Sequence, residues 1–165
     1  MANPAKKLVI YYSLDGMTAT LAKTIADTIG ADVLELRPKK PIPQAAGFVK
    51  KLVLGGMQVL LKRQPELLPL EQNPADYDLI VMGTPVWVGH LSAPFRTFLA
   101  TTRLQQKQIA LFCCYLGNAG KALDNMKQAL SGNTIVGETG FGRRDQANAA
   151  KAAAWAQKVM AEASR

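Results

Sequence analysis

The chain has 165 residues, a formal net charge of +8 and a hydrophobic fraction of 48%. These values are typical of a folded domain with a real core, and they exclude an intrinsically disordered chain. The only cysteines are adjacent, Cys113 and Cys114, and the chain has one histidine. This excludes a disulfide framework and a metal site of recognisable spacing. Cysteines of this kind favour a reduced, cytoplasmic setting. No apolar run approaches the roughly 18 residues of a membrane span, so we expect no transmembrane segment.

Five short apolar runs predict β-strands, and helical patterns separate them. After the first run, Leu21, Ile25 and Ile29 recur every four residues and Gly30 supplies a stop. The strands are expected at residues 8–13, 33–37, 79–83, 109–114 and 134–138. Several are apolar throughout, which is typical of parallel strands covered on both faces. The alternation predicts an α/β fold, a three-layer sandwich around a five-stranded, parallel, doubly wound sheet.

The three later helices have recognisable ends. Ser92 is expected to cap the first of them, and Gly132 is expected to end the second. Asp145 is a plausible cap for an alanine-rich last helix. The residues expected on its inner face are Ala152, Trp155 and Val159.

Residues 38–76 form a connection that is longer than a crossover helix needs, inside a single domain at residues 1–165. A helical pattern runs from about residue 44 to residue 63, and the pair Gly55-Gly56 within it predicts a kink or close packing. We expect this insertion to form a basic flap beside the sheet.

The positive charge of the chain is concentrated in one segment, which overlaps the first part of that flap. From residue 37 to residue 65 there is no acid, and the basic residues are Arg37, Lys39, Lys40, Lys50, Lys51, Lys62 and Arg63. A solvated face is one interpretation, and attraction of an acidic partner, an anionic membrane surface or a phosphorylated ligand is the other. Phe48 is the only aromatic residue among these bases, which disfavours nucleic-acid binding.

Ligands of open parallel sheets bind beyond the carboxyl ends of the strands. The first loop at that edge, residues 13–18 (SLDGMT), combines a tight-turning Gly16 with the hydroxyls of Ser13 and Thr18 and the start of a helix. Free N–H groups at a helix start bind phosphate without a cationic side chain. The alternative is that Ser13, Asp15 and Thr18 only shape and cap the turn.

Two further loops contribute to the same edge. Trp87, in the loop PVWVG, offers a π face to a flat, electron-poor ring, unless it only covers the edge of the core. Gly89 permits a backbone conformation that other residues resist. The loop after the fourth strand supplies Tyr115 and the glycines Gly117 and Gly120 as a flexible collar of N–H groups.

The histidine, the two cysteines and one arginine pair each have both a structural and a functional interpretation. His90 is a surface-loop histidine or a proton relay, and the two cysteines pack as small hydrophobic groups or carry thiol chemistry. Arg143 and Arg144, in the loop TGFGRRDQ after the fifth strand, are a solvated pair or a contact for a ligand phosphate or a partner.

These motifs resemble those of the flavodoxin family. Residues 13–18 resemble its phosphate loop Ser/Thr-x-Thr-Gly-x-Thr, although Asp15 and Met17 replace the usual Thr and Asn. Residues 77–99 resemble its third strand, flavin loop and following helix, and residues 55–67 resemble an insertion of one bacterial branch. The resemblance covers essentially the whole chain. It implies the strand order 2-1-3-4-5 and FMN at the carboxyl edge of the sheet.

The resemblance implies a set of cofactor-binding residues in three loops, with no catalytic residue and no metal ligand assigned. They are Ser13, Leu14, Asp15, Gly16, Met17, Thr18, Pro85, Val86, Trp87, Val88, Gly89, Tyr115, Leu116, Gly117, Asn118 and Gly120. It further implies electron transfer through a non-covalent flavin. The protein is then a carrier with a protein redox partner, for which the basic charge favours an acidic one, or a reductase that uses NAD(P)H and a quinone or flavin.

Other classes of protein remain as alternatives. A flavodoxin fold that has lost its flavin and serves as an interaction module is the main one. A response-regulator receiver is disfavoured because Ser13, Gly83 and Thr139 stand where that class needs acids and a lysine. A dinucleotide-binding Rossmann enzyme is disfavoured because no G-x-G-x-x-G follows the first strand.

Overall fold

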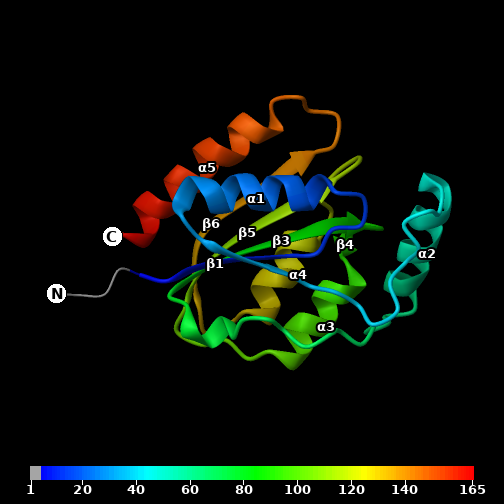
Figure 1. Cartoon of the computed structure of the whole chain (residues 1–165), viewed down its shortest axis with the longest axis horizontal. Helices are drawn as coiled ribbons and strands as arrows, with labels where there is room; N and C mark the ends of the chain where they lie inside the picture. Colours follow the sequence, from blue (N-terminus) through cyan, green and yellow to red (C-terminus); the bar gives the residue numbers. More distant parts are fainter. Residues whose placement is uncertain (1–4) are drawn as a thin grey trace.

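The computed structural model describes residues 5–165, in which a central sheet is covered by helices on both faces (Figure 1). Its five parallel strands are β1 (Lys7–Tyr11), β2 (Asp32–Glu35), β3 (Leu79–Trp87), β5 (Gln108–Tyr115) and β6 (Thr134–Gly142). They lie in the order β2-β1-β3-β5-β6, which confirms the expected order of the five strands. A two-residue strand, β4 (His90–Leu91), pairs antiparallel with the end of β3. It was not expected, because two residues are too few to show a pattern.

The helices divide between the two faces of the sheet (Figure 1). On one face lie α1 (Met17–Ile29) and α5 (Asn148–Ala163), and on the other lie α3 (Ala93–Thr101) and α4 (Ala122–Ala129). The insertion contains α2 (Phe48–Leu60) and the short 3-10 helix η1 (Pro74–Asp76). No helix within residues 5–165 is long and apolar enough to cross a membrane.

The strands are buried on both sides, as their continuous apolar runs predict. In β1, Leu8 packs in the cluster that contains Phe95 of α3, whereas the next residue, Val9, packs in the cluster that contains Ile25 of α1. All four side chains have no exposed surface. Each such burial contributes about 1.5–3 kcal/mol, so the sheet provides a rigid support for the loops at its edges.

Two caps differ from their predictions. Ser92 directly precedes α3, but its hydroxyl lies 2.9 Å from Thr84 Oγ1 and makes no capping bond to the helix. A buried hydroxyl on the neighbouring strand competes successfully with the helix N–H groups. Asp145 accepts the N–H of Ala147 at 2.9 Å, ahead of an α5 that begins only at Asn148. On α5 itself, Ala152 and Val159 are buried and Trp155 is half-buried.

The glycine pair of the insertion serves close packing and does not kink the helix, since α2 runs without a break from Phe48 to Leu60. A Cβ on Gly55 would lie 3.0 Å from Trp87 Cδ2, and a Cβ on Gly56 would lie 3.0 Å from Val88 Cγ2. The helix therefore rests with its glycine face on the turn between β3 and β4, at the carboxyl edge of the sheet (Figure 1).

Candidate functional site

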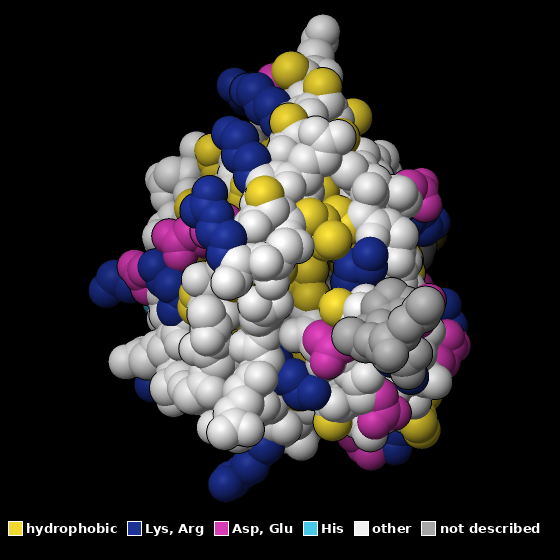
Figure 2. Space-filling view, turned by 90° about the vertical axis from the view of Figure 1, so that its left-hand side faces the viewer, with side chains coloured by type: hydrophobic (Ala, Val, Ile, Leu, Met, Phe, Trp, Pro, Cys, Tyr) yellow, Lys and Arg dark blue, Asp and Glu magenta, His cyan; other side chains and the backbone are white. Residues whose placement is uncertain are grey.

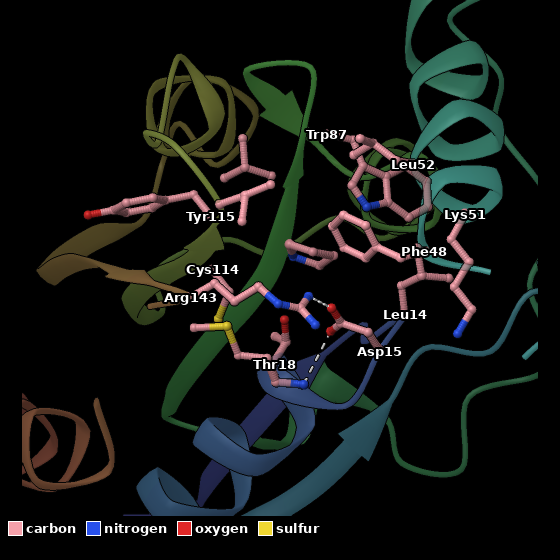
Figure 3. Close-up of a pocket in the computed structure, with 14 residues that line it drawn as sticks. Leu14, Asp15, Thr18, Phe48, Lys51, Leu52, Trp87, Cys114, Tyr115 and Arg143 are labelled. Atoms are coloured by element: carbon pink, nitrogen blue, oxygen red, sulfur yellow. Dashed lines mark hydrogen bonds and ion pairs between the residues drawn. The ribbon is translucent and has the colours of Figure 1, made fainter. Parts of the chain in front are cut away.

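A cleft opens at the carboxyl ends of β1, β3 and β5, and α2 forms one of its walls (Figure 3). It contains about 610 Å³ of empty space, including solvent at its mouth. Most of its lining is apolar. The lining residues are Leu14, Asp15, Met17, Thr18, Phe48, Lys51, Leu52, Pro85, Val86, Trp87, Cys114, Tyr115, Leu116 and Arg143.

Residues from all three predicted loops meet in this cleft, although not every predicted residue lines it. Those that do are Leu14, Asp15, Met17, Thr18, Pro85, Val86, Trp87, Tyr115 and Leu116. Outside its lining lie Ser13, Gly16, Val88, Gly89, Gly117, Asn118 and Gly120. Lining residues that sequence reasoning did not assign are Phe48, Lys51, Leu52, Cys114 and Arg143. Arg143 stood in a loop that was expected at this edge, whereas nothing in the pattern of α2 marked the helix as a wall.

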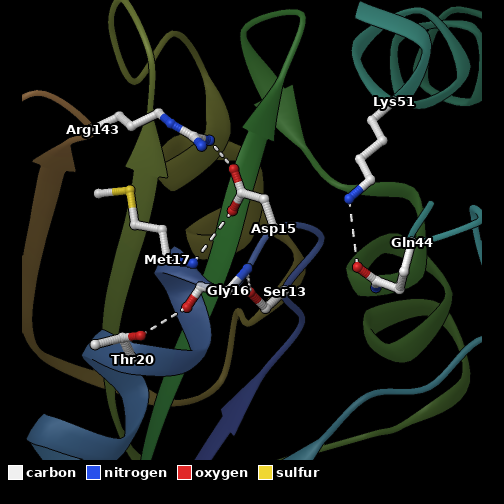
Figure 4. A network of polar contacts seen from close by, with 8 residues as sticks. All are labelled: Ser13, Asp15, Gly16, Met17, Thr20, Gln44, Lys51 and Arg143. Carbon is white, nitrogen blue, oxygen red and sulfur yellow. Dashed lines mark hydrogen bonds and ion pairs between the residues drawn. The ribbon is translucent and has the colours of Figure 1, made fainter. Parts of the chain in front are cut away.

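The loop between β1 and α1 is closed by its own side chains (Figure 4). Ser13 Oγ accepts the N–H of Gly16 at 3.1 Å, and Asp15 Oδ1 accepts the N–H of Met17 at 3.3 Å. Gly16 has a φ of +97°, a left-handed conformation that favours glycine. These N–H groups lie at the positive end of the α1 dipole, and side-chain oxygens of the loop itself accept their hydrogen bonds.

Arg143 brings a cation to this loop from the far end of the sheet. Its guanidinium pairs with the carboxylate of Asp15 (Figures 3 and 4). It also lies over the ring of Phe48, with Cζ 5.2 Å from the centroid, an arrangement typical of a cation–π contact. The backbone N–H of Arg143 donates to the carbonyl of Tyr115 at 2.8 Å, which fixes the base of the side chain. The end of β6, the start of α1 and the start of α2 therefore meet at one charged point.

Trp87 is both a wall of the cleft and a part of the core. Its side chain is only 5% exposed. The ring meets the ring of Tyr12 edge to face, with centroids 5.6 Å apart, and Gly55 of α2 packs against it. The ring of Tyr115 also packs against the protein, because it lies against Gly140 of β6.

The turn between β3 and β4 has an unusual backbone. Val88 has a φ of +50° and Gly89 has a φ of +72°. Glycine adopts this conformation readily, as expected for Gly89, but in a β-branched residue it costs on the order of 1–3 kcal/mol. A Cβ on Gly120 would lie 2.4 Å from the carbonyl oxygen of Gly89, and the N–H of Lys121 donates to that oxygen at 2.6 Å. The second and third loops are thus joined through their backbones.

The cysteines and the histidine do not form a reactive centre. Burial raises the pKa of the Cys113 thiol to about 12 and the pKa of the Cys114 thiol to about 11, so both stay protonated and poorly nucleophilic. His90 Nδ1 lies 2.9 Å from Asn125 Oδ1 of α4 and does not line the cleft. Cys113 is buried in the core, Cys114 is buried at the floor of the cleft, and His90 is held by its contact with α4.

The fold and the cleft together define a doubly wound α/β protein with a largely apolar cleft, charged at one end, at the carboxyl edge of its sheet. The flavodoxin family model matches residues 6–158. The chain belongs to the flavodoxin family.

Solved structures with a similar fold come from several bacteria. A Lactobacillus acidophilus flavoprotein, solved in complex with FMN, is 22% identical, with 92% of this chain and 99% of that chain covered and a TM-score of 0.71. A protein from Bacteroides eggerthii that is assigned as a flavoprotein is 22% identical, with 95% and 99% covered and a TM-score of 0.77. A WrbA-like flavodoxin from Agrobacterium tumefaciens is 15% identical, with 98% of each chain covered and a TM-score of 0.65.

Proposed function

We propose that this protein binds FMN without a covalent bond in the cleft at the carboxyl edge and acts as a redox protein. The proposal rests on the chemistry of the cleft. Apolar walls from Pro85 to Trp87 and from α2 lead to a polar end, where the α1 N-terminus and Arg143 meet. An apolar slot suits a flat ring system, and a helix N-terminus with a guanidinium suits a phosphate. FMN carries both groups.

The residues present fit the phosphate if one exchange takes place. The loop N–H groups of Gly16 and Met17 are occupied by Ser13 and Asp15, so a phosphate would accept these bonds in their place. In that arrangement Arg143 would turn its guanidinium from the Asp15 carboxylate to the ligand. A loop that has no cation of its own in the sequence gains one from the end of β6.

The other parts of the site hold and shield the ring. Trp87, fixed by Tyr12 and Gly55, would form a rigid wall, and Phe48 and Leu52 of α2 would cover the ring from the opposite element. When bound, FMN supplies one- and two-electron redox chemistry, while the protein supplies orientation and the electrostatic environment. Burial between apolar side chains disfavours added charge on the cofactor.

A second groove favours a reductase over a simple carrier. It shares Tyr115 and Leu116 with the cleft and runs along α5, where Lys158 and Trp155 line it together with Arg144. Bases and an aromatic ring beside a flavin suit a nicotinamide dinucleotide, which carries phosphates and flat rings. Oxidation of NAD(P)H by the purified protein in the presence of a quinone, weakened by Lys158→Glu, would support the reductase. Reduction only by a separate protein would support the carrier.

The decisive experiment is to purify the full chain with FMN supplied and record its visible spectrum and its quenching of flavin fluorescence. We expect a yellow protein that retains FMN, and weaker retention in Trp87→Ala. Lys23→Ala, an exposed change on the outer face of α1, is the matched control. A protein that neither holds FMN nor quenches its fluorescence would refute the proposal and favour an interaction module on the same fold.

A further inference from the structure

Helix α2 has a second apolar face that the core does not use. Its inner face carries Gly55, Gly56 and Val59, all buried. A stripe on the other side, spaced by four, four and three residues as one helix face requires, consists of Val49, Val53, Met57 and Leu60. These four side chains are 51 to 71% exposed. An apolar stripe of this kind, on a helix at the end of the molecule, is an unusual feature of a protein surface.

Bases stand at both ends of this stripe. Lys50 lies in the first turn of α2, and Lys62 and Arg63 follow its C-cap residue Leu61, all three bases being exposed. Across residues 5–165, none of the three forms an ion pair. The opposite end of the molecule, beside the two termini, is different, because acidic and basic side chains both appear there (Figure 2). Within residues 5–165, most of the exposed large hydrophobic residues lie between Phe48 and Leu61, so exposed aliphatic side chains and unpaired bases gather on α2 and the residues that follow it.

We propose that α2 binds the surface of an anionic phospholipid bilayer, with the stripe Val49, Val53, Met57 and Leu60 inserted among the acyl chains. Lys50, Lys62 and Arg63 then contact the lipid phosphates. An aliphatic helix face with flanking lysines and no acid is the pattern of an interfacial helix. This inference goes beyond the proposed redox function, since it rests only on the outer surface of α2.

Two other occupants fit the stripe less well. A second copy of the chain, docked through the same face, would bring the same bases against one another. Docking sites for proteins are usually centred on Trp, Tyr or Arg, and the stripe contains none of them. Charge complementarity to a surface of many phosphates therefore favours the bilayer.

Binding of α2 to a bilayer would also place the cleft relative to the lipid. Phe48, Lys51 and Leu52 line the cleft from the same helix that carries the stripe. A bilayer bound to α2 would hold the mouth of the cleft next to the lipid. Small apolar molecules dissolved in the bilayer would then reach the site along α2.

Co-sedimentation with vesicles tests the inference. The full chain, supplied with FMN, is mixed with vesicles of phosphatidylglycerol and phosphatidylcholine or of phosphatidylcholine alone. We expect binding to the anionic vesicles only. The double variant Lys50→Glu/Lys62→Glu should lose on the order of 30-fold or more, because each base near an anionic surface contributes about 1 kcal/mol. Val53→Ser/Leu60→Ser should lose about tenfold or more through its smaller apolar area.

Matched controls keep the test specific. Lys23→Glu and Leu68→Ser change an exposed base and an exposed leucine outside α2, and each should bind vesicles like the parent protein. Protein stain in the pellet measures binding, and circular dichroism checks that each variant is folded. Neither measurement depends on flavin, so failure of the FMN proposal does not obscure the result. Three outcomes would overturn the inference: no binding to anionic vesicles, equal losses in the controls, or a dimer in ultracentrifugation that Val53→Ser/Leu60→Ser abolishes.

Discussion

Asp15 is the residue whose role the structure makes most testable. It holds the N–H of Met17 and pairs with Arg143, so it occupies the region that we assign to the FMN phosphate. The substitution Asp15→Asn keeps an oxygen for the Met17 N–H but removes the negative charge. We expect this variant to bind FMN more tightly than the parent protein and to bind riboflavin, which lacks the phosphate, with unchanged affinity.

The expected size follows from the exposure of the pair. The Asp15 and Arg143 side chains are 27% and 40% exposed, so solvent screens their attraction to about 0.2–1 kcal/mol. A phosphate must break that pair and also approach the carboxylate, a repulsion of similar size in the same environment. Removing both costs should make the free energy of FMN binding more favourable by about 1 kcal/mol, which is roughly fivefold in affinity. Arg143→Gln should weaken FMN about tenfold, since a charge-assisted hydrogen bond contributes about 1.5–3 kcal/mol.

Fluorescence titration of FMN and riboflavin against each variant measures both effects. Asp27→Asn is the control, because it removes one exposed negative charge from α1 at a distance from the loop. Weaker FMN binding by Asp15→Asn, or the same change for both flavins, would refute the assignment of this loop to the phosphate. The expected gain should also shrink in high salt, as a screened interaction does.

Two further predictions concern packing and buried thiols. Gly55→Ala places a Cβ 3.0 Å from Trp87, so overpacking should exceed the helix gain of about 1 kcal/mol from alanine and lower the free energy of unfolding in urea by up to about 2 kcal/mol, whereas Gly47→Ala, with nothing within 4 Å, should not lower it. Equal effects would contradict close packing of α2. Burial raises the pKa of the Cys113 thiol from 9.0 to about 12, so the native protein should resist iodoacetamide at about pH 8. Because the unfolded thiol ionises first, stability should fall as pH rises from about 9 toward 12, and Cys113→Ala should flatten that fall; rapid alkylation of the native protein would contradict this.

The sheet was predictable because each strand satisfies its own pattern. A run such as residues 109–114 is apolar throughout, and only a strand covered on both faces uses such a run within an α/β alternation. Strand ends were less predictable. β3 continues to Trp87, four residues past the expected Gly83, because β5 and β4 pair with Pro85 and Trp87 respectively. Pairing by neighbouring strands overrides the local turn signal of Thr84-Pro85.

The cleft was predictable where its residues lie in loops at one edge, and less so where distant elements meet. The three loops had to converge because the carboxyl ends of parallel strands share an edge. Nothing local to Arg143 says that it reaches Asp15, which is far away in the sequence. The same holds for Phe48, whose ring stacks on that guanidinium from α2. Tertiary contacts of this kind depend on how the insertion folds back, which periodicity does not encode.

The packing of α2 explains why two glycines stand inside this helix, where glycine is usually avoided. Each glycine in a helix costs about 1 kcal/mol relative to alanine, and α2 has two in succession. Both sit where a Cβ would meet Trp87 or Val88 at 3.0 Å, so the cost is offset by close approach to the β3–β4 turn. That approach turns the remaining faces of α2 outward and leaves its aliphatic stripe in solvent. The position of the helix over the cleft and the exposure of its stripe therefore have one origin, the flat surface made by Gly55 and Gly56.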